Sequence, residues 1–261
     1  AGAAERVLSS AAAALTTSLA EDSEITVAIE LVDTSADALA ALCDSFGETA
    51  AVAWLDGIGY AAATAQDCGG PLLLVEQGRG SAAALGEAVQ IYANAELEIS
   101  GMTGLRNNKF CRLGYDDLYT WRVPALMLLA ANVSPIDGLE SVTDYDDYAA
   151  IIEALAEGDC DAAGLPAAEF DDLARGDARN AISAVGAPVS VPYAILMAPI
   201  EVPLGAREAL TDALLRLAET DDDALQTLLG HDGLARVSPD DLEAWDSFIA
   251  RTDLDFAQLG Q

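Results

Sequence analysis

The sequence predicts an α/β protein made of two lobes, and three features support this prediction. Helical and β-rich segments alternate along the chain, a pattern that favours mostly parallel sheets covered by helices. Hydrophobic residues make up 52% of the 261 residues, so the chain can bury a substantial core despite its charge. The β-rich segments form two groups, and the chain leaves the first group near 78–87 and returns to it near 185–193.

The first group of elements begins with apolar residues at helical spacing. Thr34 and Ser35 precede a second helical segment and can cap it by accepting hydrogen bonds from its free N–H groups. The expected helices cover residues 1–19, 36–43 and 60–65, and the expected strands cover residues 26–32, 49–55 and 71–76.

The second group follows a Gly- and Ala-rich link at 78–86. Its expected strands cover 89–93, 109–113, 160–165 and part of 184–199, and its expected helices follow Pro124 and cover 145–157. Amphipathic helices are expected at 208–218 and 240–251. We expect lobe one to contain 1–86 and 193–261 and lobe two to contain 87–192. Two chain crossings are typical of a hinge with a ligand cleft between the lobes.

The stretch from Leu105 to Leu126 is the strongest candidate for a binding site. It predicts a strand that opens through a short polar loop onto a helix N-terminus, which is how α/β proteins build small-molecule sites. The candidate contacts in this loop are Tyr115, Asp116, Asp117, Tyr119, Thr120 and Trp121. In the alternative interpretation the loop is merely exposed and its carboxylates favour the helix start. The residues alone leave both interpretations open.

The charge of the chain excludes several partners. There are 44 acidic residues against 12 basic ones, the net charge is −32, and Lys109 is the only lysine. Nucleic acid and anionic membrane surfaces are poor partners for such a field. The acidity is explained by solubility in brine or on a crowded cell exterior, or by selection for a cationic ligand. No apolar run reaches the ~18 to 20 residues of a membrane span.

The sequence offers no catalytic or metal-binding set. The only histidine, His231, lies in a GHDG turn without a nucleophile beside it, and we expect neither an enzyme nor a cofactor. Four cysteines form no CxxC motif, so a zinc site is not expected. Four cysteines allow three disulfide pairings, and disulfides would form on export.

Four segments, in order, resemble the periplasmic phosphonate- and phosphite-type solute-binding proteins of ABC importers. They are AWLDGIGYAAA, GLRNNKFCRLGYDDLYTWRVPALMLLAANVSPIDGL, AIIEALAEGDCDAAGLP and SVPYAILMAPIEVPLGAREALTDALLRLA. The resemblance implies the type II periplasmic-binding-protein fold with mixed sheets. It also implies an exported receptor whose signal segment has been removed, with an ABC permease as partner and a small molecule as ligand. Disulfides Cys43–Cys68 and Cys111–Cys160 are then expected, because a crosslink between lobes would block closure.

The resemblance also shows where this chain departs from the family. Counting back from Pro124, the family's Ser-Thr-Ser-Gly run falls on the residues from Asp117 to Thr120, so a carboxylate stands in an anion cradle. Ser35 replaces a family tyrosine and Tyr148 replaces a family histidine. Repulsion by Asp117 predicts that phosphonate and phosphite are not bound.

Aromatic rings and carboxylates instead favour a small amine-bearing or polar solute. The full set of candidate contacts is Thr34, Ser35, Trp54, Asp56, Tyr60, Tyr115, Asp116, Asp117, Tyr119, Thr120, Trp121 and Tyr148, with Tyr145 nearby. Ordinary core packing is the alternative role for Trp54 and Tyr60, and a plain helix face is the alternative for Tyr145 and Tyr148. Arg112 and Arg122 weaken the cation prediction if either neutralises Asp116 or Asp117.

A structural or surface-assembly role without a ligand remains the alternative function. Members of the family begin with a central strand of lobe one that the printed sequence does not contain. We expect that strand to come from omitted N-terminal residues or from another chain, which would produce self-assembly.

Overall fold

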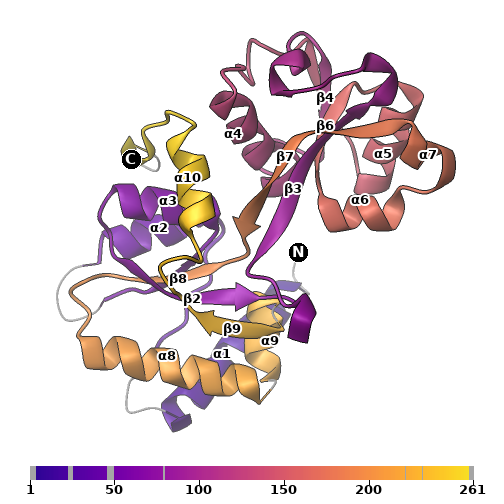
Figure 1. The fold of residues 1–261 in the computed structure, drawn as a ribbon. Helices are drawn as coiled ribbons and strands as arrows, with labels where there is room; N and C mark the ends of the chain where they lie inside the picture. The colour runs from indigo at the N-terminus through magenta and orange to yellow at the C-terminus, as the bar shows by residue number, and fades with distance from the viewer. Residues whose placement is uncertain are drawn as a thin grey trace. The chain divides into compact units, whose positions relative to one another are not determined.

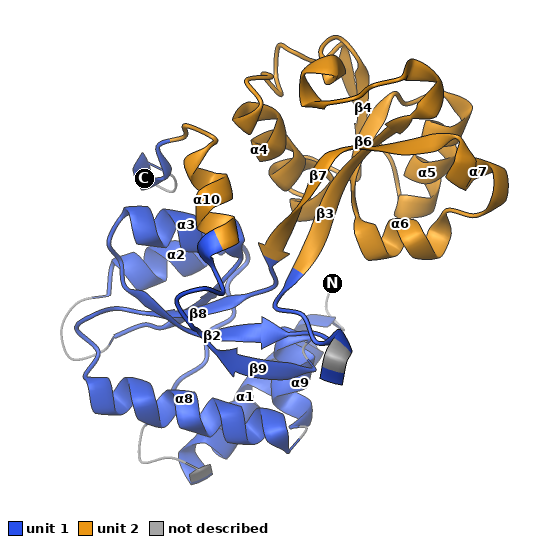
Figure 2. Ribbon diagram, in the orientation of Figure 1, with its two compact units in different colours: residues 1–86, 192–243, 255–261 blue, residues 87–191, 244–254 orange. Residues whose placement is uncertain are grey.

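The computed structural model describes residues 4–22, 26–45, 50–78, 80–220, 222–230 and 232–258. His231 and residues 1–3, which figure in the sequence predictions, lie outside this part. The chain divides into two compact units, coloured separately in Figure 2. Unit 1 contains Ala1–Gly86, Pro192–Glu243 and Asp255–Gln261, and unit 2 contains Glu87–Val191 and Ala244–Leu254.

Unit 1 is built on a four-stranded sheet in the order β1-β8-β2-β9. Its strands are β1 (Ala53–Leu55), β2 (Gly70–Glu76), β8 (Ile195–Ala198) and β9 (Gly233–Arg236). Its helices are α1 (Ala4–Asp22), α2 (Ser35–Cys43), α3 (Gly57–Ala65), α8 (Leu204–Glu219) and α9 (Asp223–Leu229), and Figure 1 shows them around the sheet. The core of the unit includes Leu73, Leu196 and Leu214.

The expectation of a mostly parallel sheet is wrong for unit 1. The returning strand β8 lies between β1 and β2 and runs antiparallel to both, and β9 runs antiparallel to β2. Alternation along the sequence suggests that neighbouring strands pair in parallel. It does not reveal that a strand from much later in the chain separates them.

The β-rich segment 26–32 forms no strand, so the prediction of a strand there is wrong. Val27 and Ile29 pack against the core of unit 1, which explains the alternating apolar residues. A strand also needs a hydrogen-bonded neighbour, and the described residues provide none for this segment. Within the part of the chain that the structure describes, β1 pairs with β8 alone. The additional strand expected for this lobe stays a prediction.

Unit 2 contains a five-stranded mixed sheet in the order β5-β4-β6-β3-β7. β4 runs parallel to β5 and β6, whereas β3 runs antiparallel to β6. The strands are β3 (Gly86–Asn94), β4 (Lys109–Arg112), β5 (Ser141–Asp144), β6 (Ala162–Pro166) and β7 (Ile182–Pro192). The α-helices are α4 (Val123–Ala130), α5 (Tyr148–Glu157), α6 (Ala167–Leu173), α7 (Gly176–Asn180) and α10 (Glu243–Ala250). The fold class is therefore α/β with two helix-flanked sheets, as predicted. The sheet of unit 2 is mixed, whereas the strand pairs described in unit 1 are antiparallel.

Short helical turns complete the described chain. Turns of 3-10 helix cover Gly80–Ala82, Ala95–Leu97, Met102–Leu105 and Phe256–Gln258.

None of the helices in the described ranges has both the length and the apolar content needed to cross a bilayer.

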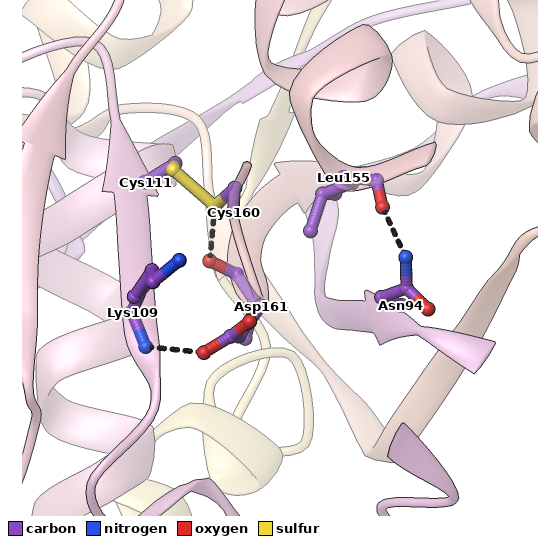
Figure 3. The surroundings of a disulfide bond; sticks show 7 residues. Asn94, Lys109, Cys111, Leu155, Cys160 and Asp161 are labelled. Atoms are coloured by element: carbon purple, nitrogen blue, oxygen red, sulfur yellow. Dashed lines mark hydrogen bonds between the residues drawn. A yellow bond between two sulfur atoms is a disulfide. The ribbon is translucent and has the colours of Figure 1, made fainter. Parts of the chain in front are cut away.

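Both predicted disulfides are present, and each lies within one unit. Cys43, at the end of α2, is bonded to Cys68. Cys111 on β4 is bonded to Cys160, which precedes the neighbouring strand β6 (Figure 3). Beside this bond the Lys109 backbone N–H donates to the Asp161 carboxylate over 2.8 Å, so the start of β4 is also hydrogen-bonded to the residue that precedes β6.

Candidate functional site

The loop after β4 is held against β6 by a close backbone contact. The chain leaves β4 at Arg112 and enters a π-helical turn, Leu118–Arg122, that continues into α4. A Cβ placed on Gly164 of β6 would lie 2.1 Å from Pro124 Cγ and 3.1 Å from the carbonyl oxygen of Tyr119. Only glycine allows this approach, so Gly164 fixes where the loop sits on the sheet.

Asp117 caps the helix that begins in this loop. Its Oδ1 accepts hydrogen bonds from the backbone N–H and from the hydroxyl of Thr120, each over 2.7 Å. Thr120 is fully buried, and its hydroxyl oxygen accepts from the Leu113 N–H over 3.0 Å. The Asp117 carboxylate thus occupies the positive end of the helix, where an anionic ligand would otherwise bind.

Tyr148, the first residue of α5, lies in a carboxylate-rich environment. Burial raises the pKa of Tyr148 to about 12, and negative charge on Asp117, Glu169, Tyr119 and Glu87 contributes in that order. These groups come from three parts of unit 2, because Asp117 and Tyr119 belong to the loop helix and its cap, Glu169 to α6 and Glu87 to β3. Three carboxylates therefore act electrostatically on Tyr148.

Sequence reasoning missed two of these carboxylates. Glu169 follows the end of β6 by three residues, and the carboxyl end of a parallel strand is where ligand contacts are expected in α/β sheets. That signal would have identified it. Glu87, at the start of β3, carries no such signal because nothing in the sequence shows that β3 lies beside β6.

The positive charge of Arg112 is paired with a carboxylate that lies outside the loop. Its Nε donates to Oδ1 of Asp144 over 2.7 Å, and its guanidinium lies 4.5 Å from the Trp121 ring centroid and 5.5 Å from that of Tyr115. Trp121 is buried, whereas Tyr115 is 70% exposed and Asp116 is exposed. The charge of Arg112 is therefore directed to Asp144, which lowers its capacity to neutralise the loop carboxylates.

The candidate residues of unit 1 form a separate hydrogen-bonded group. The Thr34 hydroxyl caps α2 by accepting from the Asp37 N–H over 3.1 Å. Asp56 caps α3 by accepting from the Gly59 N–H over 2.7 Å, and its other oxygen accepts from the Ser35 hydroxyl over 2.9 Å. A single carboxylate thus links the starts of two helices.

The two aromatic candidates of unit 1 lie in or against its core. Tyr60 on α3 is 5% exposed, and Trp54 on β1 is partly buried and packs against the core cluster. In unit 2, Tyr145 packs against the core in the same manner. Across the ranges that the structure describes, no group of three or more His, Cys, Asp and Glu side chains could hold a metal ion.

The fold is shared with solved proteins of low sequence identity. A Xanthomonas citri protein bound to ATP matches with a TM-score of 0.68 and 15% identity, over 96% of this chain and 94% of its own. PhnD1 from Prochlorococcus marinus in complex with methylphosphonate matches with a TM-score of 0.54 and 14% identity, over 94% and 92%. A TctC solute-binding protein from Polaromonas matches with a TM-score of 0.54 and 13% identity, over 97% and 91%.

A comparison with curated proteins returned no match. The family model described as "ABC transporter, phosphonate, periplasmic substrate-binding protein" matches residues 3–242. Members of this family are binding proteins and not enzymes, which confirms the expectation of a non-catalytic protein. The chain therefore belongs to the family of phosphonate-type periplasmic substrate-binding proteins of ABC transporters.

Proposed function

We propose that this protein is the solute receptor of an ABC importer and that its solute is a small amine-bearing or polar molecule instead of a phosphonate. Family membership supports the receptor role. The two disulfides suit an oxidising compartment outside the cytoplasm. The observation that carries the change of ligand is the capping of the loop helix by the Asp117 carboxylate.

A phosphonate would compete with Asp117 for the same donors. The Thr120 N–H and hydroxyl, which a bound anion would need, both donate to Asp117. A second negative charge at about 4 Å would cost roughly 1 kcal/mol in water and about 4 kcal/mol at the effective dielectric of a protein surface. The Asp117 carboxylate itself accepts the hydrogen bonds that a bound anion would accept.

The same electrostatics support a cationic group. The carboxylates of Asp117, Glu169 and Glu87 act on Tyr148, and the charge of Arg112 is directed to Asp144. An ammonium group gains from charge pairing with carboxylates and from the faces of tyrosine rings, by about 0.5–2 kcal/mol per ring. We therefore assign Asp117, Tyr119, Tyr148 and Glu169 as the unit 2 contacts of the solute.

A thermal-shift screen followed by titration calorimetry tests this proposal. Putrescine, ethanolamine, choline and basic amino acids are compared with methylphosphonate and phosphite at neutral pH. We expect an amine to raise the melting temperature, since a ligand at 100 times its Kd stabilises the native state by about 2.7 kcal/mol. Asp117→Asn should weaken amine binding, and Asp116→Asn, on the adjacent exposed carboxylate, should not.

Two results would contradict the proposal. Micromolar binding of methylphosphonate or phosphite by the unmodified protein would show that Asp117 does not exclude the anion. Equal losses of amine binding in Asp117→Asn and Asp116→Asn would show that the attraction comes from the general acidity of the chain.

A further inference from the structure

A groove on unit 2 lies outside the candidate solute site. It runs between α5 on one side and the segment from the end of α6 through α7 on the other, and Figure 1 shows these helices side by side. The cavity has a volume of about 430 Å³. None of the solute contacts assigned above lines it.

The floor of the groove is apolar and made of small side chains. Ala149, Ile152 and Ala156 lie on one face of α5, three and four residues apart, and Ala178 and Ala181 line the opposite side. Leu173 adds an apolar side chain that is 42% exposed. Because alanine side chains are short, an incoming backbone can approach this floor closely, and larger side chains of a partner can fill the trough.

The rim of the groove is negatively charged. Glu153, Glu157 and Asp177 are exposed, and none of the salt bridges among the described residues involves them. The one basic residue, Arg175, turns its guanidinium onto its own chain, where it donates to the carbonyl oxygens of Asp171 and Ala174. Three carboxylates therefore face outward around an apolar floor.

We propose that this groove docks one amphipathic helix of a partner protein, with an apolar anchor on the floor and Lys or Arg residues beside the rim. The ten residues of α5 span about 15 Å, which matches roughly three turns of a docked helix. Apolar residues at helical spacing between basic flanks are the usual chemistry of helix-in-groove recognition. The same rim repels acidic peptides, nucleic acid and anionic bilayers.

A small solute fits the groove less well than a helix. Its floor offers alanine, isoleucine and leucine side chains, which provide no hydrogen bonds to orient a small molecule. Its polar groups stand at the rim and, Arg175 aside, carry one sign of charge. This arrangement suits an extended partner that covers the apolar floor and meets the rim on both sides.

Fluorescence anisotropy with a defined helix tests the inference. The probe is a fluorescein-labelled peptide of about 15 residues with leucines on one face and lysines on the other. It is titrated with purified protein at physiological ionic strength. The groove variant is Glu153→Gln with Glu157→Gln, and the matched control is Glu201→Gln with Glu208→Gln in unit 1. Both pairs are exposed and both remove the same charge.

We expect the peptide to bind saturably. The double substitution in the groove should raise its Kd at least tenfold, and the double substitution in unit 1 should raise it less than twofold. Ala178→Leu, which fills the groove without changing the charge, should also weaken binding at least tenfold. Circular dichroism and melting curves establish that each variant is folded before it is compared. The inference is overturned by equal weakening in the two pairs, by full affinity in Ala178→Leu, or by the absence of saturable binding. Failure of the solute proposal would leave these results unchanged, because Asp117→Asn should bind the peptide normally.

Discussion

At the scale of single residues, carboxylates act as built-in anions at helix starts. Asp117 caps the loop helix, Asp56 caps α3 and is bonded to the start of α2, and Asp147 caps α5 by accepting from the Ala150 N–H over 2.8 Å. Each carboxylate satisfies donors that would otherwise need water or a ligand. Asp117 thus favours the helix start, as the alternative interpretation of the loop expects, and whether it also contacts a solute stays a prediction. The same residue gives the loop its negative charge.

The ionisation of Tyr148 responds to this charge, although burial of the ring has the larger effect. Its pKa is raised to about 12, first by burial and then by the neighbouring carboxylates. An unfolded tyrosine ionises near 10. Between about pH 10 and 12 the unfolded chain therefore loses a proton that the folded chain keeps, and stability falls as the pH rises through this window.

Difference titration at 295 nm, comparing the unmodified protein with Tyr148→Phe, measures this value. We expect a phenol that titrates near 12, and a lower midpoint in Asp117→Asn because one repulsive charge is removed. A midpoint near 10 for Tyr148 would show that the ring is solvated and that the carboxylates do not act on it.

At the scale of elements, the packing of the loop helix on β6 positions the site. Gly164 admits Pro124 and the carbonyl of Tyr119, and the disulfide between Cys111 and Cys160 holds β4 to the start of β6. The close contact at Gly164 and the disulfide both involve β4, from which the loop leaves, or β6, against which the loop packs. The rigidity of the site therefore comes from the sheet beneath it.

Replacing Gly164 by alanine should destabilise the protein by at least about 1–3 kcal/mol, the usual cost of overpacking a buried position. The new methyl group would lie 2.1 Å from Pro124 Cγ, which forces the loop helix to move. Urea denaturation measures the change. Gly205→Ala on α8 is the matched control, because its Cβ meets nothing within 4 Å and alanine is favoured in helices by about 1 kcal/mol. A stabilised Gly164→Ala protein would disprove the close contact.

Removal of either disulfide should lower the free energy of unfolding. The sequence separations of 25 and 49 residues correspond to about 3.5 and about 4 kcal/mol of loop entropy. The paired variants Cys43→Ala with Cys68→Ala and Cys111→Ala with Cys160→Ala, measured by urea denaturation, test both values. Peptide mapping without reductant verifies the pairing first. Loss of less than about 1 kcal/mol in either variant would indicate that the denatured chain is already compact.

At the scale of the whole molecule, the main electrostatic feature is the excess of acidic residues. The excess of 44 acidic over 12 basic residues leaves most carboxylates without a basic partner. Arginines form the ion pairs with Asp144, Asp171 and Asp212. Like charges repel across the folded surface, which opposes the compact state. Stability then rests on apolar cores and disulfides more than on ion pairs.

Added salt should therefore stabilise the protein. Raising KCl from 0.05 to 1 M shortens the screening length from about 14 Å to about 3 Å and weakens the self-repulsion. We expect the melting temperature to rise by several degrees, and a sucrose control separates screening from solute exclusion. An unchanged or lower melting temperature would show that the charges are already accommodated in the native state.

The sequence by itself determined the α/β class, the order of most elements, both disulfide pairings through the family resemblance, and the strand, loop and helix around Asp117. These features depend on local periodicity, on cap chemistry and on an ordered set of motifs. The tertiary structure alone decided that β8 lies between β1 and β2, that residues 26–32 find no strand partner among the described residues, and that Glu87 and Glu169 act on Tyr148. Each of these depends on segments far apart in the chain. Local pattern fixes what a segment prefers, but strand partners and charge neighbours follow from how the whole chain packs.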